Sequence, residues 1–372
     1  MDKFDLTYAT VDSLSEGVGS SQIAPLMERL SAHSMKINLI TFEKNSAPSA
    51  LIERMENAGV EWTKIPFGNR GPLGGVARTI RLSKLMQDST LVHARSDFPA
   101  VAARFSGQSR ILWDVRSLWA DQRKFIEESR IKQEFFSMYS LFEDLACNSS
   151  CALSTLTNAV VPVLEARHKN LPKIRTVVPT AVDLNRFKFA STMPKKLKGL
   201  YSGTFNKYYD LDLSKRFIEV LRKLVDCDID WARPQESQIT SLNAGENYSF
   251  SVSHPEMANL MSSYSFGLSI CHETAGPSLK AAMPTKIAEF LAIGRPVVVN
   301  AGLGDCDEIL KSSGAGVVIS HGDDLESKAA ELIEICENLA TPNRCRDIAT
   351  NYFSLDSGID KYRNIYQSML SK

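Results

Sequence analysis

Residues 284–300 read PTKIAEFLAIGRPVVVN, and this segment indicates the class of the fold. Its pattern predicts a short helix, a glycine stop and a buried strand. Lys286 and Glu289 stand three residues apart, so they share one face of that helix. The helix N-terminus and Lys286 suit a diphosphate, and Glu289 can accept hydrogen bonds from ribose hydroxyls. The segment therefore predicts a nucleotide-sugar site; the alternative is an ordinary surface ion pair.

Strand-like and helix-like segments alternate along the chain. The strands predicted for the first half are Phe4–Thr10, Lys36–Phe42, Leu91–Arg95, Ile111–Arg116, Cys151–Leu156 and Arg175–Pro179. Those predicted for the second half are Gly199–Phe205, Asp228–Ala232, Tyr248–Val252, Phe266–Ile270, Pro296–Asn300 and Gly316–Ser320. The helical stretches between them include a long one, Trp119–Ala146. This alternation predicts an α/β protein with two doubly wound, Rossmann-like parallel sheets.

The length of 372 residues favours two domains. Residues 1–187 form the predicted N-terminal domain, residues 188–355 the C-terminal domain, and residues 356–372 a final helical segment. That helix is amphipathic, with one apolar side made of Ile359, Tyr362, Ile365, Tyr366 and Met369. Ligands bind outside the carboxyl ends of parallel strands, so two facing domains would both line a cleft with their strand ends.

Composition limits the function classes. Lys+Arg and Asp+Glu both total 43, and a formal net charge of zero argues against nucleic acid as the main partner. No apolar run has the length of a membrane span, and the N-terminus lacks the regions of a signal peptide. The seven cysteines have no regular spacing, which predicts reduced, buried thiols and a cytoplasmic protein.

A glycine-bearing loop, Glu16–Gln22, follows the first predicted strand and opens the first helix. Gly17 and Gly19 permit close backbone approach, and the helix N-terminus beside Ser20 attracts an anion. It is not a dinucleotide fingerprint, because the third glycine is missing. The alternative is a tight turn with a serine cap.

Polar residues also follow two central strands of the first domain. Arg95, Arg116 and Asp121 are candidates for holding acceptor or donor groups, while Arg116 and Asp121 could instead form a structural ion pair. His93 lies within its strand, where a satisfied core histidine is the alternative to a functional one.

In the second domain, Gly203 and Lys207 follow the first strand and suit a diphosphate; the alternative for Lys207 is a solvated loop lysine. Lys280 and Lys286 lie near one predicted helix start. No metal site is expected. Asp210-Leu211-Asp212 is at a helix start, where acidic caps are normal.

Together these segments resemble the family-4 retaining glycosyltransferases, which have the GT-B fold, over nearly the whole chain. Residues 284–298 are similar to the family's donor-site helix and following strand, and residues 178–187 to its interdomain signature. Residues 20–26 and 114–121 are similar to a subgroup of bacterial surface-polysaccharide enzymes.

The resemblance implies a nucleotide-sugar donor of UDP or GDP type, no further cofactor, and a glycan or lipid-linked acceptor. It implies that Glu289 binds the ribose, that Lys286 and Lys207 face the phosphates, and that the loop at Gly17 and Gly19 closes over the donor. The last helix would cross back to the N-terminal domain, which would be the acceptor side.

Two departures from the family pattern stand out. The family often has two glutamates eight positions apart, but the position eight before Glu289 is Ala281, and Ser278 and Lys280 are the nearest substitutes. The expected arginine near Gly203 is also absent, which leaves Lys207.

Residues and resemblance combine into one set of predictions. The predicted donor-binding residues are Gly17, Gly19, Ser20, Gly203, Thr204, Lys280, Pro284, Thr285, Lys286 and Glu289. The predicted catalytic residues are Arg116, Asp121, Lys207 and Lys286, and the acceptor-side candidates are His93, Arg95 and Trp119. Same-face attack through an oxocarbenium-like transition state is favoured, because no side chain is an obvious nucleophile.

Two other functions fit the same pattern. A sugar-nucleotide epimerase would use cleft carboxylates, for which Asp97, Asp121 and Glu273 are available. A non-catalytic nucleotide-sugar-binding subunit would explain the missing glutamate. Peripheral contact with the inner face of a membrane is a further hypothesis. Arg78, Arg81 and Lys84 have the helical spacing for it, although a solvated helix face is the alternative.

Overall fold

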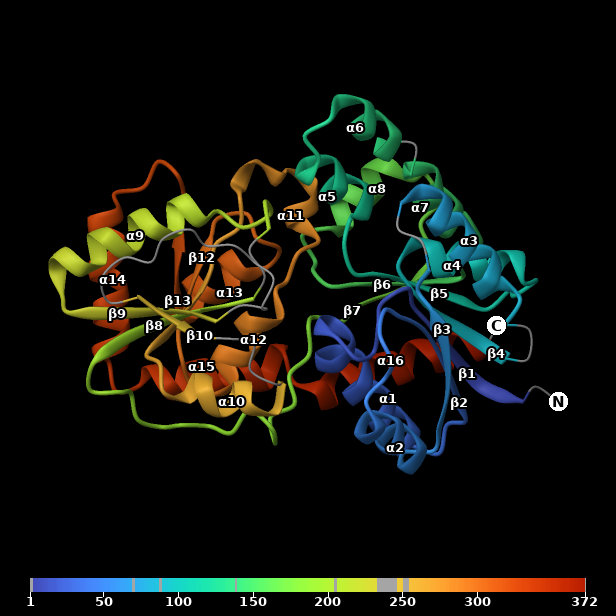
Figure 1. The fold of residues 1–372 in the computed structure, drawn as a ribbon, viewed down its shortest axis with the longest axis horizontal. Coiled ribbons are helices and arrows are strands. Elements are labelled where there is room, and N and C mark those ends of the chain that lie inside the picture. Colours follow the sequence, from blue (N-terminus) through green and yellow to red (C-terminus); the bar gives the residue numbers. More distant parts are fainter. Residues whose placement is uncertain are drawn as a thin grey trace. The chain divides into compact units, whose positions relative to one another are not determined.

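A computed structural model describes residues 3–371 apart from 69–70, 87–88, 138, 204–205, 233–245 and 250–253. The chain divides into two compact units. Unit 1 comprises Met1–Ala120, Arg130–Pro179 and Leu355–Lys372, and unit 2 comprises Asp121–Ser129 and Thr180–Ser354. Figure 1 shows that each unit is a sheet flanked by helices.

The described part of unit 1 forms a parallel sheet of seven strands in the order β3-β2-β1-β4-β5-β6-β7. The strands are β1 (Phe4–Ala9), β2 (Ile37–Glu43), β3 (Val60–Pro66), β4 (Ser89–Arg95), β5 (Ile111–Val115), β6 (Ala152–Thr155) and β7 (Ile174–Val177). The direction in which successive strands are added to the sheet reverses between β1 and β4. These two strands are neighbours, and Tyr8 lies opposite His93. The predicted doubly wound parallel fold is therefore confirmed for this unit.

Helices cover both faces of this sheet. Their bounds are η1 (Gly19–Ile23), α1 (Ala24–Ser31), α2 (Ser49–Asn57), α3 (Pro72–Ser83), α4 (Asp97–Phe105), α6 (Arg130–Ser137), α7 (Ser140–Ser149), α8 (Val161–Arg167) and α16 (Leu355–Leu370). Helix α5 (Trp119–Ile126) lies mostly within Asp121–Ser129, which groups with unit 2. The single helical stretch predicted for Trp119–Ala146 is wrong, since α5, α6 and α7 replace it. Between α5 and α6, the Ser129 amide bonds to the side chain of Glu127, which offers the backbone an alternative to the helical ladder.

Strand β3 was not predicted from the sequence. It lies at the sheet edge and pairs only with β2 in the described part of the unit. Val60 and Ile65 are buried, whereas Glu61 and Lys64 are exposed. An edge strand with so many solvent-facing polar residues lacks the continuous apolar run that marks the central parallel strands.

The described part of unit 2 forms a six-stranded parallel sheet in the order β10-β9-β8-β11-β12-β13. The strands are β8 (Leu197–Ser202), β9 (Cys227–Ala232), β10 (Glu246–Ser249), β11 (Phe266–Ser269), β12 (Val297–Asn300) and β13 (Gly316–Ile319). Strands were predicted at all six places, although residues 250–252 of the predicted strand Tyr248–Val252 lie outside the described residues. The order reverses between β8 and β11. The predicted fold class is confirmed here too.

The helical elements of unit 2 are α9 (Leu211–Leu224), α10 (His254–Ser262), η2 (Glu273–Ala275), α11 (Pro277–Lys280), α12 (Thr285–Ala292), α13 (Cys306–Ser313), α14 (Leu325–Glu337) and α15 (Thr341–Tyr352). Helices α9 and α14 share one apolar core with the sheet, which includes Phe217, Trp231 and Leu332. Helix α15 packs on α12 and was not predicted, because its sequence is largely polar.

A glycine and an arginine fix the backbone path of the segment that follows α12. Gly294 has φ +87°, which L-residues other than glycine rarely adopt, so it ends the helix. Arg295 is buried and donates hydrogen bonds to the backbone oxygens of Tyr264, Ala190 and Thr192. These bonds satisfy a buried charge and set the start of β12.

The final helix, α16, belongs to unit 1 and packs against β7 and α1. All five apolar residues predicted to share one side are buried: Ile359, Tyr362, Ile365, Tyr366 and Met369. Residues 180–187, in contrast, group with unit 2. Arg346 holds this segment by donating hydrogen bonds to the backbone oxygens of Leu184 and Phe187. Among the described residues, no helix has both the length and the apolarity to span a membrane.

Candidate functional site

The start of α12 brings a buried cation to the carboxyl edge of the unit 2 sheet. Pro284 is the N-cap residue, with φ −57° and ψ 134°, and Thr285 begins the helix. Lys286 follows and is only 6% exposed. Gly203, just past β8, has φ +131°, and a Cβ atom there would lie 3.1 Å from Lys286 Nζ. Glycine therefore permits both the backbone conformation and the close approach of the ammonium group.

Two aromatic rings contact the ammonium group of Lys286. Its Nζ lies 4.3 Å from the ring centre of Tyr201 and 4.3 Å from that of Tyr209. Within the described part of the chain, Nζ has no hydrogen-bond partner. Burial lowers the pKa of Lys286 to about 8, although Cys271 and Glu289 act in the opposite direction. A buried ammonium without a hydrogen-bond acceptor is costly, and an anionic ligand would supply the missing partner.

Glu289 lies one helical turn after Lys286 and is 7% exposed. Both predicted donor-site residues are therefore buried on α12, and the alternative of a solvent-exposed ion pair does not describe them. The carboxylate opposes part of the lowering of the Lys286 pKa that burial causes. A carboxylate and an ammonium group thus share one helix start, as their spacing predicts.

The other predicted donor residues of unit 2 differ in their exposure. Lys207 is exposed and forms an ion pair with Glu128. Lys280 ends α11 rather than beginning α12, and its Nζ lies beside Gly302, the loop residue that follows β12. Thr204 lies outside the described residues. Lys286 is therefore the buried member of this group of lysines.

The position of the missing glutamate lies in the interior of unit 2. Ala281 is fully buried at the end of α11. Ser278, one of its nearest polar substitutes, is also buried and donates a hydrogen bond to the Ala275 backbone oxygen at 2.8 Å. Its hydroxyl also lies 3.3 Å from the Tyr208 hydroxyl. Ser278 of α11 is thus bonded to η2 and to the loop that follows β8.

Three residues that the sequence did not connect meet at this same sheet edge. Asp210 Oδ2 lies 3.2 Å from His272 Nδ1 and 2.9 Å from His321 Nε2. Asp210 caps α9, as expected for an acidic residue at a helix start, since its Oδ1 accepts a hydrogen bond from the Leu213 amide. The three residues are far apart in sequence and have no motif spacing. The available signal was that each of them follows a predicted strand.

The glycine loop of unit 1 is firmly anchored. A Cβ on Gly19 would lie 1.9 Å from the Ser13 backbone oxygen, so only glycine fits there. Ser20 Oγ donates to the Gly17 backbone oxygen at 3.0 Å. The buried carboxylate of Glu43 accepts hydrogen bonds from the Ser13 hydroxyl and the Leu14 amide. The loop has the tight-turn character of the alternative interpretation, and its donor role stays a prediction.

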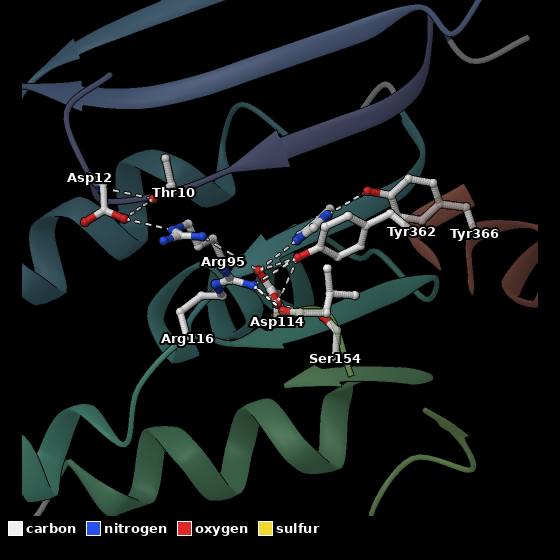
Figure 2. A network of polar contacts seen from close by, with 10 residues as sticks. Thr10, Asp12, Arg95, Asp114, Arg116, Ser154, Tyr362 and Tyr366 are labelled. Carbon is white, nitrogen blue, oxygen red and sulfur yellow. Dashed lines mark hydrogen bonds and ion pairs between the residues drawn. The ribbon is translucent and has the colours of Figure 1, made fainter. Parts of the chain in front are cut away.

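A buried ionic network occupies the carboxyl edge of the unit 1 sheet (Figure 2). Asp114, at 0% exposure, lies at its centre. Its Oδ1 is 3.6 Å from Arg116 Nη1, and its Oδ2 is 3.9 Å from Arg95 Nη1. Ser154 donates a hydrogen bond to it at 2.7 Å. Burial alone would raise the pKa of Asp114, but Arg116, His93 and Arg95 hold that pKa well below its usual range.

The final helix contributes to the same network. His93 is fully buried, with Nε2 3.2 Å from Asp114 Oδ2 and Nδ1 2.7 Å from the Tyr366 hydroxyl. Burial lowers the pKa of His93. Arg116 Nη1 donates hydrogen bonds to the Tyr362 hydroxyl and the Val178 backbone oxygen, both at 3.2 Å. His93 and Arg116 thus have partners within this network, although Arg116 Nε has no hydrogen-bond partner among the described residues. Their functional roles stay predictions.

The remaining candidates of unit 1 have diverse surroundings. Arg95 is buried and donates from Nε to Asp12 Oδ2 at 3.0 Å. The Trp119 ring packs edge-on against Phe98 and Tyr139, within an aromatic cluster. Asp121 is half-buried in α5 and belongs to the short segment that groups with unit 2. The carboxylate beside Arg116 is that of Asp114, which the sequence did not single out.

Comparisons with known proteins identify the fold. No protein-family model matches the sequence, and no curated protein matches it. Among solved structures, a glycosyltransferase from Rickettsia africae aligns with 14% identity and a TM-score of 0.70, over 100% of this chain and 99% of its own. WaaG, a glycosyltransferase involved in lipopolysaccharide biosynthesis, aligns with 12% identity and a TM-score of 0.69, over 95% and 98%.

A third similar structure is that of HepE from Anabaena in complex with UDP. It aligns with 12% identity and a TM-score of 0.67, over 98% of this chain and 100% of its own. At these identities the likeness concerns the fold. The chain has the α/β GT-B fold, with two parallel sheets, that these glycosyltransferases share.

Proposed function

We propose that this protein is a glycosyltransferase that moves a sugar from a nucleotide-sugar donor to a hydroxyl group of a glycan or lipid-linked glycan. The observation that carries the proposal is Lys286, a buried ammonium without a hydrogen-bond acceptor in the described part of the chain, at the carboxyl edge of a Rossmann-like sheet. Ligands of such sheets bind at that edge. A diphosphate is the anion that a nucleotide sugar would bring there.

The carboxylate of Glu289 supports a nucleotide rather than a simple phosphate. It lies on the same helix as Lys286 and interacts with it, so phosphate and ribose groups would meet complementary partners one turn apart. The similar fold of HepE, whose structure contains UDP, agrees with a UDP-type donor. We assign donor binding to Gly203, Pro284, Thr285, Lys286 and Glu289.

The transfer that we propose is retaining and proceeds by attack from the face of the departing phosphate. Lys286 would stabilise the negative charge that develops on the leaving diphosphate. Lys207 would join it after leaving Glu128, and this exchange is inexpensive because both partners are exposed. No cofactor beyond the nucleotide-sugar co-substrate is assigned to the transfer.

A role in surface polysaccharide synthesis at the inner face of a membrane completes the proposal. The resemblance to WaaG supports the pathway. Helix α3 supports the membrane contact, because Val76 and Ile80 are exposed at 43% and 52% and lie beside exposed Arg81 and Lys84. Arg78 is not part of this surface, since its guanidinium covers the Phe67 ring at 4.1 Å. Flotation with anionic vesicles, comparing the wild type with an Arg81→Ala/Lys84→Ala variant, tests the contact.

Donor binding is tested by a thermal-shift screen of nucleoside diphosphates and their sugars, because a bound ligand raises the melting temperature by mass action. We expect one nucleotide class to stabilise the wild type and to have much less effect on Glu289→Ala. Equal shifts in both proteins would refute the site. Incubating the protein with the selected donor, with and without acceptor, then separates transfer from epimerisation, since an epimerase converts the donor alone.

A further inference from the structure

Asp210, His272 and His321 converge at the carboxyl edge of the unit 2 sheet. They follow β8, β11 and β13 respectively. We propose that these three side chains bind one divalent transition-metal ion of the Zn²⁺ class. Two imidazole nitrogens and one carboxylate oxygen are a ligand set that suits such ions. This inference is independent of the proposed transfer reaction.

Backbone hydrogen bonds hold the first two ligands in place. Tyr209 forms an antiparallel bridge with Cys271. On either side of it, the Asp210 amide donates to the Ile270 oxygen and the His272 amide to the Tyr208 oxygen, both at 3.0 Å. The loops that follow β8 and β11 are thus joined just where the two ligands leave them. A preformed site of this kind loses little conformational entropy when an ion binds.

His321 is held from two sides. Its amide donates to Glu273 Oε1 at 3.1 Å, and Glu273 directly follows His272 in the chain. The preceding residue, Ser320, forms a turn in which its amide donates to Asp323 Oδ2 at 2.9 Å. The third ligand is therefore tied to the same loop as the second.

The distances between the three ligand atoms fit one ion. Asp210 Oδ2 is 3.2 Å from His272 Nδ1 and 2.9 Å from His321 Nε2, and all three atoms lie within 4.8 Å of one another. Zinc lies about 2.0–2.2 Å from nitrogen and oxygen ligands, so tetrahedral ligands are separated by about 3.3 Å. The two contacts with Asp210 would change by a few tenths of an ångström. The two histidine nitrogens, which lie within 4.8 Å of each other, would approach each other by rotation of their partly exposed side chains.

Exposure of the three side chains indicates an accessible site. The Asp210 side chain is 2% exposed, whereas those of His272 and His321 are 34% and 46% exposed. The ion would therefore rest on a buried carboxylate and remain open to solvent on the histidine side. Three protein ligands leave a fourth position for water.

Arg216 should weaken the binding of the ion. Its Nη2 lies 3.4 Å from Nδ1 of His321. When Nε2 binds a metal, Nδ1 carries the proton and no longer accepts a hydrogen bond from the guanidinium. Arg216 is exposed on α9 and can rotate away, but its charge still repels the ion. Removing Arg216 should therefore strengthen metal binding, whereas a purely hydrogen-bonded triad predicts no such gain.

The ion would link three loops next to the candidate donor site. Tyr209, the neighbour of Asp210, contacts the Lys286 ammonium group through its ring. Metal binding would therefore stabilise one wall of the Lys286 environment. We assign the ion this structural role, and failure of metal binding would leave the transfer proposal untouched.

The experiment titrates the full-length, chelator-treated protein with ZnCl₂ by calorimetry. We expect one ion per chain, and an affinity loss of at least about 100-fold in His272→Ala and in His321→Ala. Asp210→Asn should also bind weakly while keeping the helix cap, because asparagine caps as well as aspartate does. His33→Ala, which removes an exposed histidine of unit 1, is the matched control and should bind like the wild type. Arg216→Ala should bind about two- to fivefold more tightly.

Substitution with Co²⁺ identifies the ligands without relying on activity. Nitrogen and oxygen ligands give no thiolate-to-cobalt charge-transfer band, whereas a site made from the seven free cysteines would. A wild type that binds no Zn²⁺, histidine variants that retain its affinity, or a thiolate band would each overturn the proposal.

Discussion

Unit 1 and unit 2 each bury charge at the carboxyl edge of a parallel sheet, but the partners of the two buried charges differ. In unit 1, Asp114 is surrounded by two arginines, a histidine and a serine hydroxyl (Figure 2). In unit 2, Lys286 is packed against two tyrosine rings and has no hydrogen-bond acceptor within the described residues.

The difference separates a structural charge from one that is ready for a ligand. The partners of Asp114 keep its pKa low, while burial of Lys286 lowers its pKa to about 8. A carboxylate with enough partners stabilises the fold around it. An ammonium without an acceptor destabilises the free protein, and a bound anion would offset that cost.

The largest effect should follow the removal of the charge of Asp114. Asp114→Asn leaves Arg95 and Arg116 buried without their shared carboxylate, and we expect a loss of about 3–5 kcal/mol in the free energy of unfolding. Urea denaturation measures it. Asp356→Asn, at a side chain that is 73% exposed, is the control and should change stability by less than about 0.5 kcal/mol. A small effect of Asp114→Asn would break the contrast between the units.

The second effect concerns transfer. Lys286→Met keeps the length and apolar stem of the side chain but removes the charge that would stabilise the leaving phosphate. We expect turnover to fall by about 10²–10³-fold, which is the usual cost of losing one such group. Initial rates with saturating donor and acceptor measure it. Turnover close to that of the wild type would show that Lys286 is not the phosphate partner.

The same variant should be more stable than the wild type at neutral pH. Below about pH 8 the folded protein carries a buried charge, so wild-type stability should rise as pH increases from about 8 towards the ordinary lysine range. The whole difference amounts to about 3 kcal/mol, since one pKa unit corresponds to about 1.4 kcal/mol. Denaturation at several pH values should show this slope in the wild type but not in Lys286→Met. If the wild type shows no such slope, the buried charge of Lys286 does not destabilise the folded protein.

Asp97 offers an intermediate case within unit 1. Burial and Glu143 raise its pKa to about 7, while the Trp113 indole donates to its Oδ1 at 3.0 Å. The folded protein holds this proton up to about pH 7 and the unfolded chain loses it earlier. Stability should therefore fall between the ordinary aspartate range and about pH 7. Asp97→Asn keeps the acceptor and should be more stable than the wild type at about pH 8, as measured by denaturant titration. The gain should be at most about 4 kcal/mol, because one pKa unit corresponds to about 1.4 kcal/mol. If the variant is no more stable than the wild type, the ionised Asp97 carboxylate does not destabilise the folded protein.

The smallest effect is expected at Lys207. It is exposed and already paired with Glu128, so Lys207→Met should lower turnover by about two- to tenfold and leave stability within about 0.5 kcal/mol. Comparing it with Lys286→Met in one assay separates the two lysines. Equal losses in the two variants would show that burial is not what distinguishes them.

Much of the fold could be predicted because buried parallel strands are continuous apolar runs. The run at Val297–Asn300 is an example. Strand β3 escaped prediction because polar residues interrupt its apolar ones, and helix α15 because its residues are mostly polar; neighbouring elements stabilise both. The breaks between α5, α6 and α7 had no proline or glycine to mark them.

In the candidate site, too, local relations were predictable from the sequence and long-range contacts were not. Lys286 and Glu289 were predictable because their relation is local, three residues apart on one helix. Their burial was not, because it depends on Tyr201, Tyr209 and Gly203, which come from other segments.

Periodicity and spacing thus determined the two parallel α/β sheets and the Lys286–Glu289 pair, because short-range patterns encode secondary structure and shared helix faces. Only the tertiary structure decided which charges have partners. Asp114 meets Tyr362 of the last helix, and Asp210 meets His272 and His321, through contacts between residues far apart in the chain. Such contacts depend on how strands and loops converge at a sheet edge, and no local pattern carries that information.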